Sequence, residues 1–600
     1  MIGLHRHTPA IARISDEAFL REWMALADAC PHGTCYQQPP FVLAWYRCYA
    51  EVFEPVVIEE RDDDGTLSGL FCLARDRRTG DIIGAGRDQA EYHAWLARPA
   101  QSCAFFERAL DLLAHTWPDG HIQFLFAAPG LALELSPRWR SRVVHRPIPR
   151  PLMSTGPEAP LAESMKKSAN RSRLNRLKKL GLVSFERLTT VDALSAALDE
   201  IIPFYECRQG AIHAALPFHL DPHKRAFLLA LMAEPGLLHT TVLRVNGRVI
   251  AAHIGPCNGR QVVLGIIAHS PFYSKYSAGK LLIRFLGLKL QEEGFSHLDL
   301  TPGGEYKDRF ASDHDEASVL DVWFQHKGVR AYKLQRALID AGKRFVSTDR
   351  LKEQVAYARH KAGLIRPAEA PRKVLNLARL AAHGAPSVDV YRREAASVST
   401  TGIERIFARD SLWDLTTYEP SELWQPPVPA FLRMAMERLE RGEHVYTCVR
   451  DGRLACVGWL IEQADTMLIP ELQQTVSYPA GSSLIYDGYT DPRYRRLGLY
   501  SALIRQAAAD TAAEPATRAI YMSVLAHNPV SRHAVERAGF TLERTIAAAG
   551  SPLSSALATV AHAAGLAMPI LTARSNPSGA GAKSGTPPAA DAAGGHHPAA

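Results

Sequence analysis

The sequence lacks the cysteine patterns that hold a metal ion or a disulfide framework. Its nine cysteines are odd in number, and none forms a Cys-x-x-Cys pair or a Cys/His cluster with zinc spacing. No apolar signal segment opens the sequence either, since Asp16, Glu17 and Glu22 follow a start that contains His and Arg. These absences argue against a zinc protein and a secreted disulfide scaffold. We expect a cytoplasmic protein with free thiols and no metal.

A strong excess of one charge is missing as well. The net charge is only +7 over 600 residues, and 22% of the residues are charged while 47% are hydrophobic. That composition is typical of soluble globular domains and excludes wholesale disorder. The weak positive charge favours an anionic ligand such as a nucleotide, but it is too diffuse to indicate nucleic-acid binding.

One stretch, 546–570, contains no Asp, Glu, Lys or Arg. It is long enough to cross a bilayer, but its residues are mostly small, and Gly550, Pro552 and Pro569 interrupt it. We expect a packed or peripheral helix here, with a peripheral membrane contact as the alternative.

One local pattern occurs three times along the chain. Two apolar strands flank a turn at 64–65, 246–247 and 451–452, and each turn is an Asp-Gly or Asn-Gly pair, which adopts positive φ readily. The turns recur at intervals of roughly 200 residues, far longer than a solenoid repeat. The pattern predicts three α/β modules of mixed, mostly antiparallel sheet flanked by helices.

We call these domains the first, middle and third modules. The predicted bounds are 1–155, 156–343 and 386–548, with a basic helical linker at 344–385 and an Ala/Gly/Pro-rich tail at 549–600. The tail has nothing to bury in a core, so we expect it to be disordered. The first module shows no glycine-bearing phosphate loop, so we interpret it as a degenerate copy of the other two modules.

In the third module a predicted strand at 484–489 leads into a basic, glycine-bearing turn that opens a helix. Such a turn presents free N–H groups and the positive end of a helix dipole to an anion, and a glycine lets the backbone approach a pyrophosphate. We therefore expect a phosphate-binding loop here. Its candidate cofactor-binding residues are Tyr489, Arg495, Arg496, Leu497, Gly498, Leu499 and Tyr500.

A second motif follows at 528–540, where a capped helix led by Asn528 and Ser531 ends in Gly-Phe. Together the two motifs resemble those of GNAT acetyltransferases, which bind acyl-CoA through an (Arg/Gln)-x-x-Gly-x-(Gly/Ala) loop followed by an Asn-led helix. The resemblance implies a CoA role for Asn528 and Ser531. Two departures stand out: Tyr500 occupies the final Gly/Ala position, and Val535 stands where many members carry a tyrosine general acid.

The middle module contains a related helix start, with Ser277, Gly279 and Lys280 as candidate phosphate contacts. Residues 15–340 resemble CelD-type proteins of cellulose and exopolysaccharide biosynthesis, which show an Asp-x-x-x-Gly-x-x-Tyr-Lys element like the one at 299–307. Polar residues at a strand's C-terminal end are typical of α/β sites. The candidates for substrate contact or proton transfer are His253, Asp299, Glu305, Tyr306 and Lys307.

In the third module, Tyr486 and Asp487 lie on the strand that should border the thioester, and Asp487 is the better candidate base. Strand alternation predicts that these two side chains point to opposite faces.

We therefore expect an acyl-CoA-dependent N-acyltransferase, with acetyl-CoA or another acyl-CoA as donor. The expected acceptor is a small amine, for example an amino sugar linked to extracellular polysaccharide biosynthesis. Two alternatives remain open. One is a FemAB-like aminoacyl transferase that takes aminoacyl-tRNA, because the helix at 166–179 carries seven cations. Such a run is more often a solvated helix face, so we expect no nucleic-acid partner. The other is a non-catalytic CoA-binding scaffold.

Overall fold

The computed structural model describes residues 1–131, 133–343, 387–422 and 425–548. The predicted linker, the predicted tail and most of the apolar stretch 546–570 lie outside these ranges. Among the described residues, no helix has the length and apolar character needed to cross a membrane.

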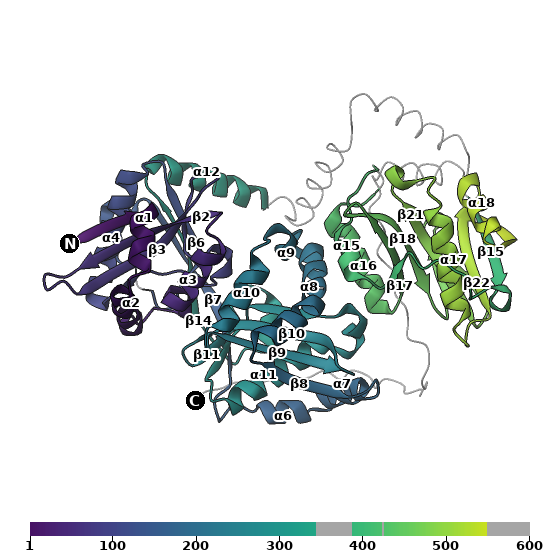
Figure 1. Cartoon of the computed structure of the whole chain (residues 1–600), viewed down its shortest axis with the longest axis horizontal. Coiled ribbons are helices and arrows are strands. Elements are labelled where there is room, and N and C mark those ends of the chain that lie inside the picture. Colours follow the sequence, from purple (N-terminus) through teal and green to yellow (C-terminus); the bar gives the residue numbers. More distant parts are fainter. Residues whose placement is uncertain (132, 344–386, 423–424, 549–600) are drawn as a thin grey trace, which may run out of the picture.

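The first module folds around a small antiparallel sheet in the order β1-β2-β3-β4, with β5 beside β3 (Figure 1). β2 and β3 form the predicted hairpin. Alternate residues of β2 enter different cores: Val57 packs with helices α2 and α3, while Val56 and Ile58 pack with α4. The elements are β1 (Ile2–Arg6), α1 (His7–Ile14), α2 (Glu17–Ala29), α3 (Pro39–Cys48), β2 (Phe53–Arg61), β3 (Leu67–Asp76), β4 (Ile82–Gly84), β5 (Leu96–Ala97) and α4 (Ser102–Thr116).

A nine-stranded sheet joins the first and middle modules, in the order β6-β14-β7-β13-β11-β10-β9-β8, with β12 beside β10. Its strands are β6 (His121–Ala127), β7 (Val143–Ser154), β8 (Val183–Leu188), β9 (Leu238–Val245), β10 (Arg248–Asn258), β11 (Gln261–Val263), β12 (Ile266–His269), β13 (His297–Asp299) and β14 (Asp313–Trp323). β14 pairs with both β6 and β7, and β7 pairs in turn with β13. The predicted boundary at residue 155 therefore does not separate two sheets, because the modules exchange strands across it.

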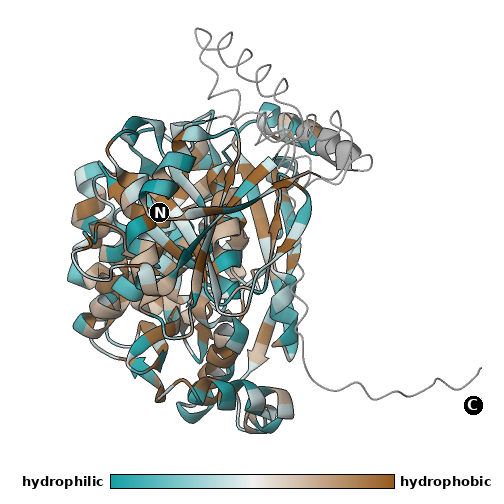
Figure 2. Cartoon of the chain, turned by 90° about the vertical axis from the view of Figure 1, so that its right-hand side faces the viewer, coloured by the Kyte–Doolittle hydropathy of each residue, from teal (hydrophilic) through white to brown (hydrophobic). Residues whose placement is uncertain are grey.

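Helices cover both faces of this sheet. Residues of α8 share a core with Val242 and Ala252, whereas residues of α11 share another core with Leu243 and Ala251, so the two helices lie on opposite faces. Figure 2 views the molecule from the side of the third module, where brown apolar residues cover much of the strands and teal polar residues are mixed with brown ones on the helices. The helices are α5 (Pro137–Arg140), α6 (Leu161–Lys166), α7 (Ser168–Lys178), α8 (Val191–His213), α9 (Pro217–Leu220), α10 (Lys224–Ala233), α11 (Ala278–Glu292) and α12 (His326–Lys343).

The third module has a seven-stranded sheet in the order β16-β17-β18-β21-β22-β15-β23 and a separate hairpin of β19 and β20. Its first strand, β15, lies between β22 and β23, just as β7 lies between β13 and β14. Both modules therefore complete their sheets with a strand that precedes the rest of the module. The strands are β15 (Ser387–Glu394), β16 (Ala408–Arg409), β17 (His444–Arg450), β18 (Arg453–Ile461), β19 (Thr466–Ile469), β20 (Gln474–Ser477), β21 (Ser482–Thr490), β22 (Ala519–Leu525) and β23 (Thr541–Ala547).

The third module docks on the middle one through helix α16. Leu432 of α16 lies so close to Gly210 of α8 that a Cβ on the glycine would meet its Cδ1 at 2.4 Å. The Cys207 thiol donates to the Leu412 carbonyl at 3.3 Å, and the Ser274 hydroxyl donates to Glu440 at 3.0 Å. The helices of this module are α15 (Leu412–Thr416), α16 (Val428–Arg441), α17 (Leu499–Ala512) and α18 (Pro529–Arg537).

Candidate active sites

The third module contains a fork between two parallel strands. β21 pairs with β22 only from Ser482 to Ile485, and beyond that point it pairs with β18 alone. The register with β18 shifts at the same place, and Asp487 has a positive φ of 47°. This bulge bends β21 away from β22. The strands therefore diverge at their C-terminal ends, where a ligand can lie between them.

A helix N-terminus lies beside this fork. Gly498 caps α17 in the left-handed region at φ 76°, and the first backbone hydrogen bond of the helix joins Ala502 to Gly498. The N–H groups of 499–501 precede that bond and have no partner within the helix. A Cβ on Gly498 would meet no atom within 4 Å, so its φ, rather than crowding by the protein, favours glycine at this position.

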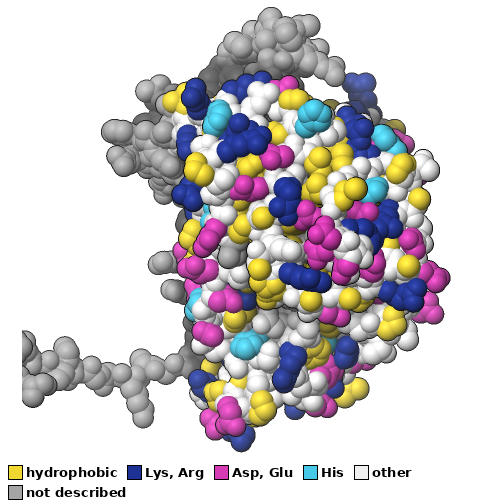
Figure 3. Space-filling model, turned by 90° about the vertical axis from the view of Figure 1, so that its left-hand side faces the viewer, with side chains coloured by type: hydrophobic (Ala, Val, Ile, Leu, Met, Phe, Trp, Pro, Cys, Tyr) yellow, Lys and Arg dark blue, Asp and Glu magenta, His cyan; other side chains and the backbone are white. Residues whose placement is uncertain are grey.

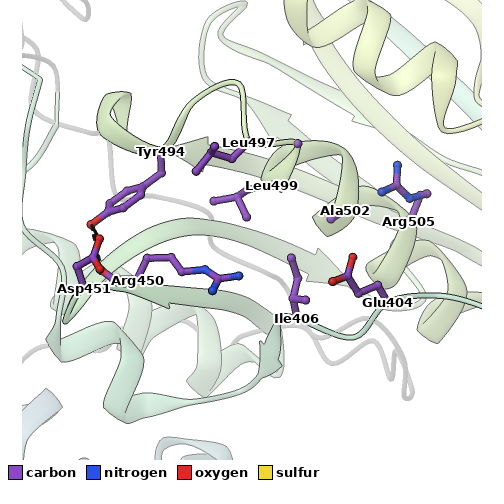
Figure 4. Close-up of a pocket in the computed structure, with 10 residues that line it drawn as sticks. Glu404, Ile406, Arg450, Asp451, Tyr494, Leu497, Leu499, Ala502 and Arg505 are labelled. Carbon is purple, nitrogen blue, oxygen red and sulfur yellow. Dashed lines mark hydrogen bonds between the residues drawn. The ribbon is translucent and has the colours of Figure 1, made fainter.

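A pocket of about 440 Å³ opens at this helix start (Figure 4). Leu497, Gly498 and Leu499, three of the predicted residues, line it. Two cations that were not among the predicted residues, Arg450 and Arg505, line it too. Its remaining lining residues are Glu404, Ile406, Asp451, Tyr494 and Ala502.

Other predicted loop residues have different roles in this structure. Arg495 donates to Glu422 at 2.8 Å, and it does not line the pocket. Tyr489 lies on β21 and shares a hydrogen bond of 2.9 Å with the Ser421 hydroxyl. Tyr500 packs against Gly488 of β21, where a Cβ would come within 2.5 Å of the ring. The bulky tyrosine at the Gly/Ala position is thus accommodated by a glycine in the strand.

Arg496 is exposed, with a positive φ of 69°, beside the pocket-lining residues.

Asn528 caps α18, because its side-chain oxygen accepts from the Ser531 N–H at 3.2 Å. Val535 is fully buried in the core. It therefore packs the module and offers no proton.

Tyr486 and Asp487 point to the same side of the sheet, so the prediction of opposite faces is wrong. Arg438 of α16 donates to Asp487 at 2.7 Å and lies 5.0 Å from the centre of the Tyr486 ring. The bulge at Asp487 breaks the alternation. The Tyr486 hydroxyl in turn donates to Glu443. Burial raises the pKa of Tyr486 well above its usual value, although Arg438 opposes this shift.

The middle module contains an equivalent fork. β11 pairs in parallel with β13, and the Leu264 N–H donates to the Asp299 carbonyl at 2.9 Å. Gly265 then takes a positive φ of 49°, and β12 pairs with β10 alone. At the nearby start of α11, Ser277 caps the helix in the left-handed region at φ 58°, the place that Gly498 takes in the third module. Gly279 lies in the first turn against His269, and a Cβ there would come within 3.1 Å of that ring.

Lys280 follows in the same turn and is exposed. His253 lies elsewhere, in the middle of β10, fully buried on the α11 face. Its Nε2 lies 3.3 Å from the Val263 carbonyl, and burial lowers its pKa to about 3. The structure does not bring His253 together with the other middle-module candidates.

At the base of the middle fork, Asp299 is the centre of a buried network. It accepts from Tyr92 of the first module at 2.9 Å, from Arg150 of β7 at 2.9 Å and from the Thr301 N–H at 2.8 Å. Burial raises the pKa of Asp299, and the Arg150 guanidinium opposes this shift. With its acceptor oxygens already used, Asp299 holds the end of β13 in place.

Lys307 donates to the Thr301 hydroxyl at 2.8 Å and to two carbonyls of the same loop, so it orders the turn beyond β13. Tyr306 is 46% exposed, and Glu305 is exposed at the start of the short helix η5 (Glu305–Arg309).

Sequence reasoning missed Glu91, which the first module places at this fork. Burial raises the pKa of Glu91 to about 7, and the Lys307 ammonium and the Thr301 side chain oppose this shift. Glu91 also lies near Tyr205 of α8 and Tyr92. A carboxyl that titrates near neutral pH at the end of diverging strands is suited to accept a proton. No local pattern around residue 91 signals this role, because its neighbours come from distant parts of the chain.

In the described part of the chain, no group of three His, Cys, Asp or Glu side chains is arranged to hold a metal ion.

Two family models match the chain. The acetyltransferase (GNAT) domain model matches residues 165–332, and the acetyltransferase (GNAT) family model matches residues 407–540. No curated protein matches.

Several solved structures are similar to parts of this chain at low identity. A conserved protein of unknown function from Bacteroides thetaiotaomicron is 12% identical, with 54% of this chain and 100% of that chain covered and a TM-score of 0.35. L-PGS from Bacillus licheniformis is 8% identical, with 50% and 95% covered and a TM-score of 0.32. FemX is 10% identical, with 52% and 98% covered and a TM-score of 0.34.

These structural likenesses bear on neither mechanism nor substrate, and neither family match names the CelD-type proteins. The two forks with their left-handed helix caps lie within the matched ranges. The chain carries two GNAT acetyltransferase domains and is a GNAT-type N-acyltransferase.

Proposed function

We propose that the protein transfers an acyl group from acyl-CoA, with acetyl-CoA as the donor, to a small amine, and that the middle fork performs the reaction. The observation that carries this proposal is the placement of Glu91 beside Thr301, where β12 and β13 diverge. Both forks offer a helix N-terminus to the pyrophosphate of CoA. Only the middle one places beside it a carboxyl with a pKa near neutrality.

The chemistry follows from that placement. Glu91 takes a proton from the acceptor ammonium, and the free amine attacks the thioester carbonyl. A C–N bond forms and the C–S bond breaks, and its electron pair leaves with the sulfur as CoA thiolate. The nitrogen, which is positively charged after the attack, loses its second proton to water and becomes the neutral amide. Water protonates the thiolate, whose thiol resembles free cysteine with a pKa of roughly 8–9, so a dedicated acid is not required.

The third fork supports a donor-binding role better than a catalytic one. Asp487, its candidate base, is held by Arg438, and Tyr486 is held by Glu443. A carboxylate oxygen that already accepts from a guanidinium is not free to contact an acceptor amine. We propose that this module binds acyl-CoA and contributes α16 to the middle site.

One observation favours a second donor class, an aminoacyl-tRNA. The exposed face of α7 lines a groove of about 310 Å³ with Arg171, Arg176 and Lys179. A run of cations is suited to a nucleic-acid backbone. Elsewhere charge is mixed: on the face shown in Figure 3, basic and acidic side chains are interspersed.

Finer assignments are part of this proposal. The resemblance to proteins of polysaccharide biosynthesis suggests an amino sugar as acceptor. We also propose a cytoplasmic location, with a peripheral membrane contact through the stretch 546–570. Of that stretch only 546–548 is described.

Calorimetric titration of the full-length protein with acetyl-CoA tests the donor class. We expect two binding sites in the wild type and one in each of Gly498→Val and Ser277→Val, because a β-branched residue strongly disfavours positive φ. Glu91→Gln should keep both sites and lose acetyl-CoA turnover. Consumption of aminoacyl-tRNA without acetyl-CoA binding would establish the second donor class instead.

A further inference from the structure

Arg208 of α8 is a partly buried cation without a partner. Among the described residues it forms no hydrogen bond and no ion pair. Two other partly buried arginines of the same module do find carboxylates: Arg187 reaches Glu293 at 2.8 Å, and Arg244 reaches Glu186 at 2.5 Å. A guanidinium carries five N–H donors, and removing it from water leaves them in need of acceptors.

The charged neighbours of Arg208 locate it at the opening of the middle fork. It interacts electrostatically with His269 at the end of β12 and with Tyr306 of η5, beyond β13. These two residues belong to opposite arms of the fork. A side chain near both therefore lies across the opening between them.

The third neighbour of Arg208 bears a carboxylate and comes from the third module. Glu440 of α16 interacts electrostatically with Arg208, but the two form no ion pair, and Glu440 accepts from the Ser274 hydroxyl at 3.0 Å. Burial lowers the pKa of Arg208, and Glu440 and Tyr306 oppose that shift. The guanidinium thus stays charged while its hydrogen-bonding capacity remains free.

The helix that carries Arg208 bears on which ligand it meets. α11, whose N-terminus would take the donor's pyrophosphate, packs on one face of the sheet, and α8 packs on the other. The Arg208 side chain extends from α8 toward the end of β12, where His269 lies against Gly279 of the α11 start. Glu91, the proposed base for the acceptor amine, lies near Tyr205, one turn before Arg208 on α8, so an acceptor held at Glu91 is within reach of the same helix.

We propose that Arg208 binds an anionic group, a carboxylate or a phosphate, on the acceptor. The acceptor of the middle module is then an amine with a negatively charged substituent, its amino group at Glu91 and its anion at Arg208. Arginine suits this role because its planar fork pairs with carboxylate and phosphate in two-point geometry. The inference rests on the proposed acyl transfer at this fork.

The test uses the full-length protein, acetyl-CoA and two pairs of probe acceptors: glucosamine 6-phosphate beside glucosamine, and glycine beside glycinamide. We expect the wild type to prefer the charged member of at least one pair. Arg208→Gln should raise the KM for that charged acceptor by about tenfold or more, because one charge-assisted pairing is lost. The KM for acetyl-CoA and the rate with the neutral acceptor should stay within about twofold.

Arg225→Gln is the matched control, since Arg225 pairs with Asp199 on the outer side of α8 and should change neither KM. Equal losses with charged and neutral acceptors, or a rise only in the KM for acetyl-CoA, would overturn the inference. Calorimetry separates the two proposals. If acetyl-CoA does not bind the wild type, the proposed function is wrong; if it binds but no charged probe depends on Arg208, only this inference is wrong.

Discussion

In the third module, the positive charge that faces the pocket comes from Arg450 and Arg505, while Arg495 is held by Glu422. We expect Arg450→Ala and Arg505→Ala each to weaken CoA binding about tenfold, the effect of losing one hydrogen bond to a charged group. Arg495→Ala should change the affinity less than about twofold. Calorimetric titration measures all three. If Arg495→Ala weakened CoA binding more than the other two substitutions, Arg495 would have to leave Glu422 for the phosphates when CoA binds.

Glu91 gives the middle fork a pH dependence. Its pKa is raised to about 7 by burial, with Lys307 and Thr301 opposing and Asp299 adding to the shift, and Tyr36, Tyr92 and Tyr205 also face it. Since the ionised form is the base, kcat/KM should rise with pH up to about 7. Glu91→Gln should lower kcat by about 100-fold or more and abolish that rise.

Glu91→Gln should also change stability with a defined sign. A carboxyl whose pKa is raised on folding stabilises the protein fully below its unfolded pKa, and this contribution is lost as pH rises through about 7. The variant should therefore gain in melting temperature relative to the wild type between pH 5 and pH 8. Glu305→Gln, at an exposed position of the same site, is the control and should show no such trend.

Among the elements, β15 is the strand on which the third module most depends. It pairs with β22 on one side and β23 on the other, and it buries Val388, Val390 and Tyr391. The matched range 407–540 leaves it out. We expect the fragment 387–548 to unfold cooperatively and 400–548 to lose several kcal/mol, at roughly 1.5–3 kcal/mol per buried side chain. Thermal melts followed by circular dichroism compare the two, and equal transitions would contradict this dependence.

Elements with local signals could be predicted from the sequence. The Asn-Gly turn at 246–247 and the Asp-Gly turn at 451–452 both adopt positive φ between antiparallel strands, as expected. The places of β7, β14 and β15 in their sheets could not be predicted, because their partners are remote in sequence. The bulge at Asp487 was missed for a related reason. It depends on the register with β18 rather than on residues 486–488.

The same division applies to the candidate sites. Gly498 was found because a glycine in a basic turn before a helix is a visible sign of a phosphate loop. Ser277 was found in the same way, from the Gly279 and Lys280 that follow it. Arg208 and Glu91 carry no comparable mark. Each meets charged groups of another module, so only the fold brings those groups together.

At the scale of the whole molecule, α8 and α16 hold the middle and third modules together. Gly210→Leu should force Leu432 aside, and such overpacking destabilises by about 1–3 kcal/mol. We expect faster limited proteolysis of the full-length protein and weaker binding of a charged acceptor at the middle site. Adding Leu432→Ala should restore both by making room. No change in either readout would show that the α8–α16 contact does not hold the modules together.

The exchange of β7 and β14 also has a consequence for biosynthesis. While the chain emerges from the ribosome, β6 and β7 are complete long before their shared partner β14 has been translated. Because sheet pairing between distant segments forms slowly, the early strands must wait with open edges. Ribosome-stalled chains ending before residue 313 should therefore bind chaperones strongly, and chains extended past residue 360, with β14 outside the exit tunnel, should be released.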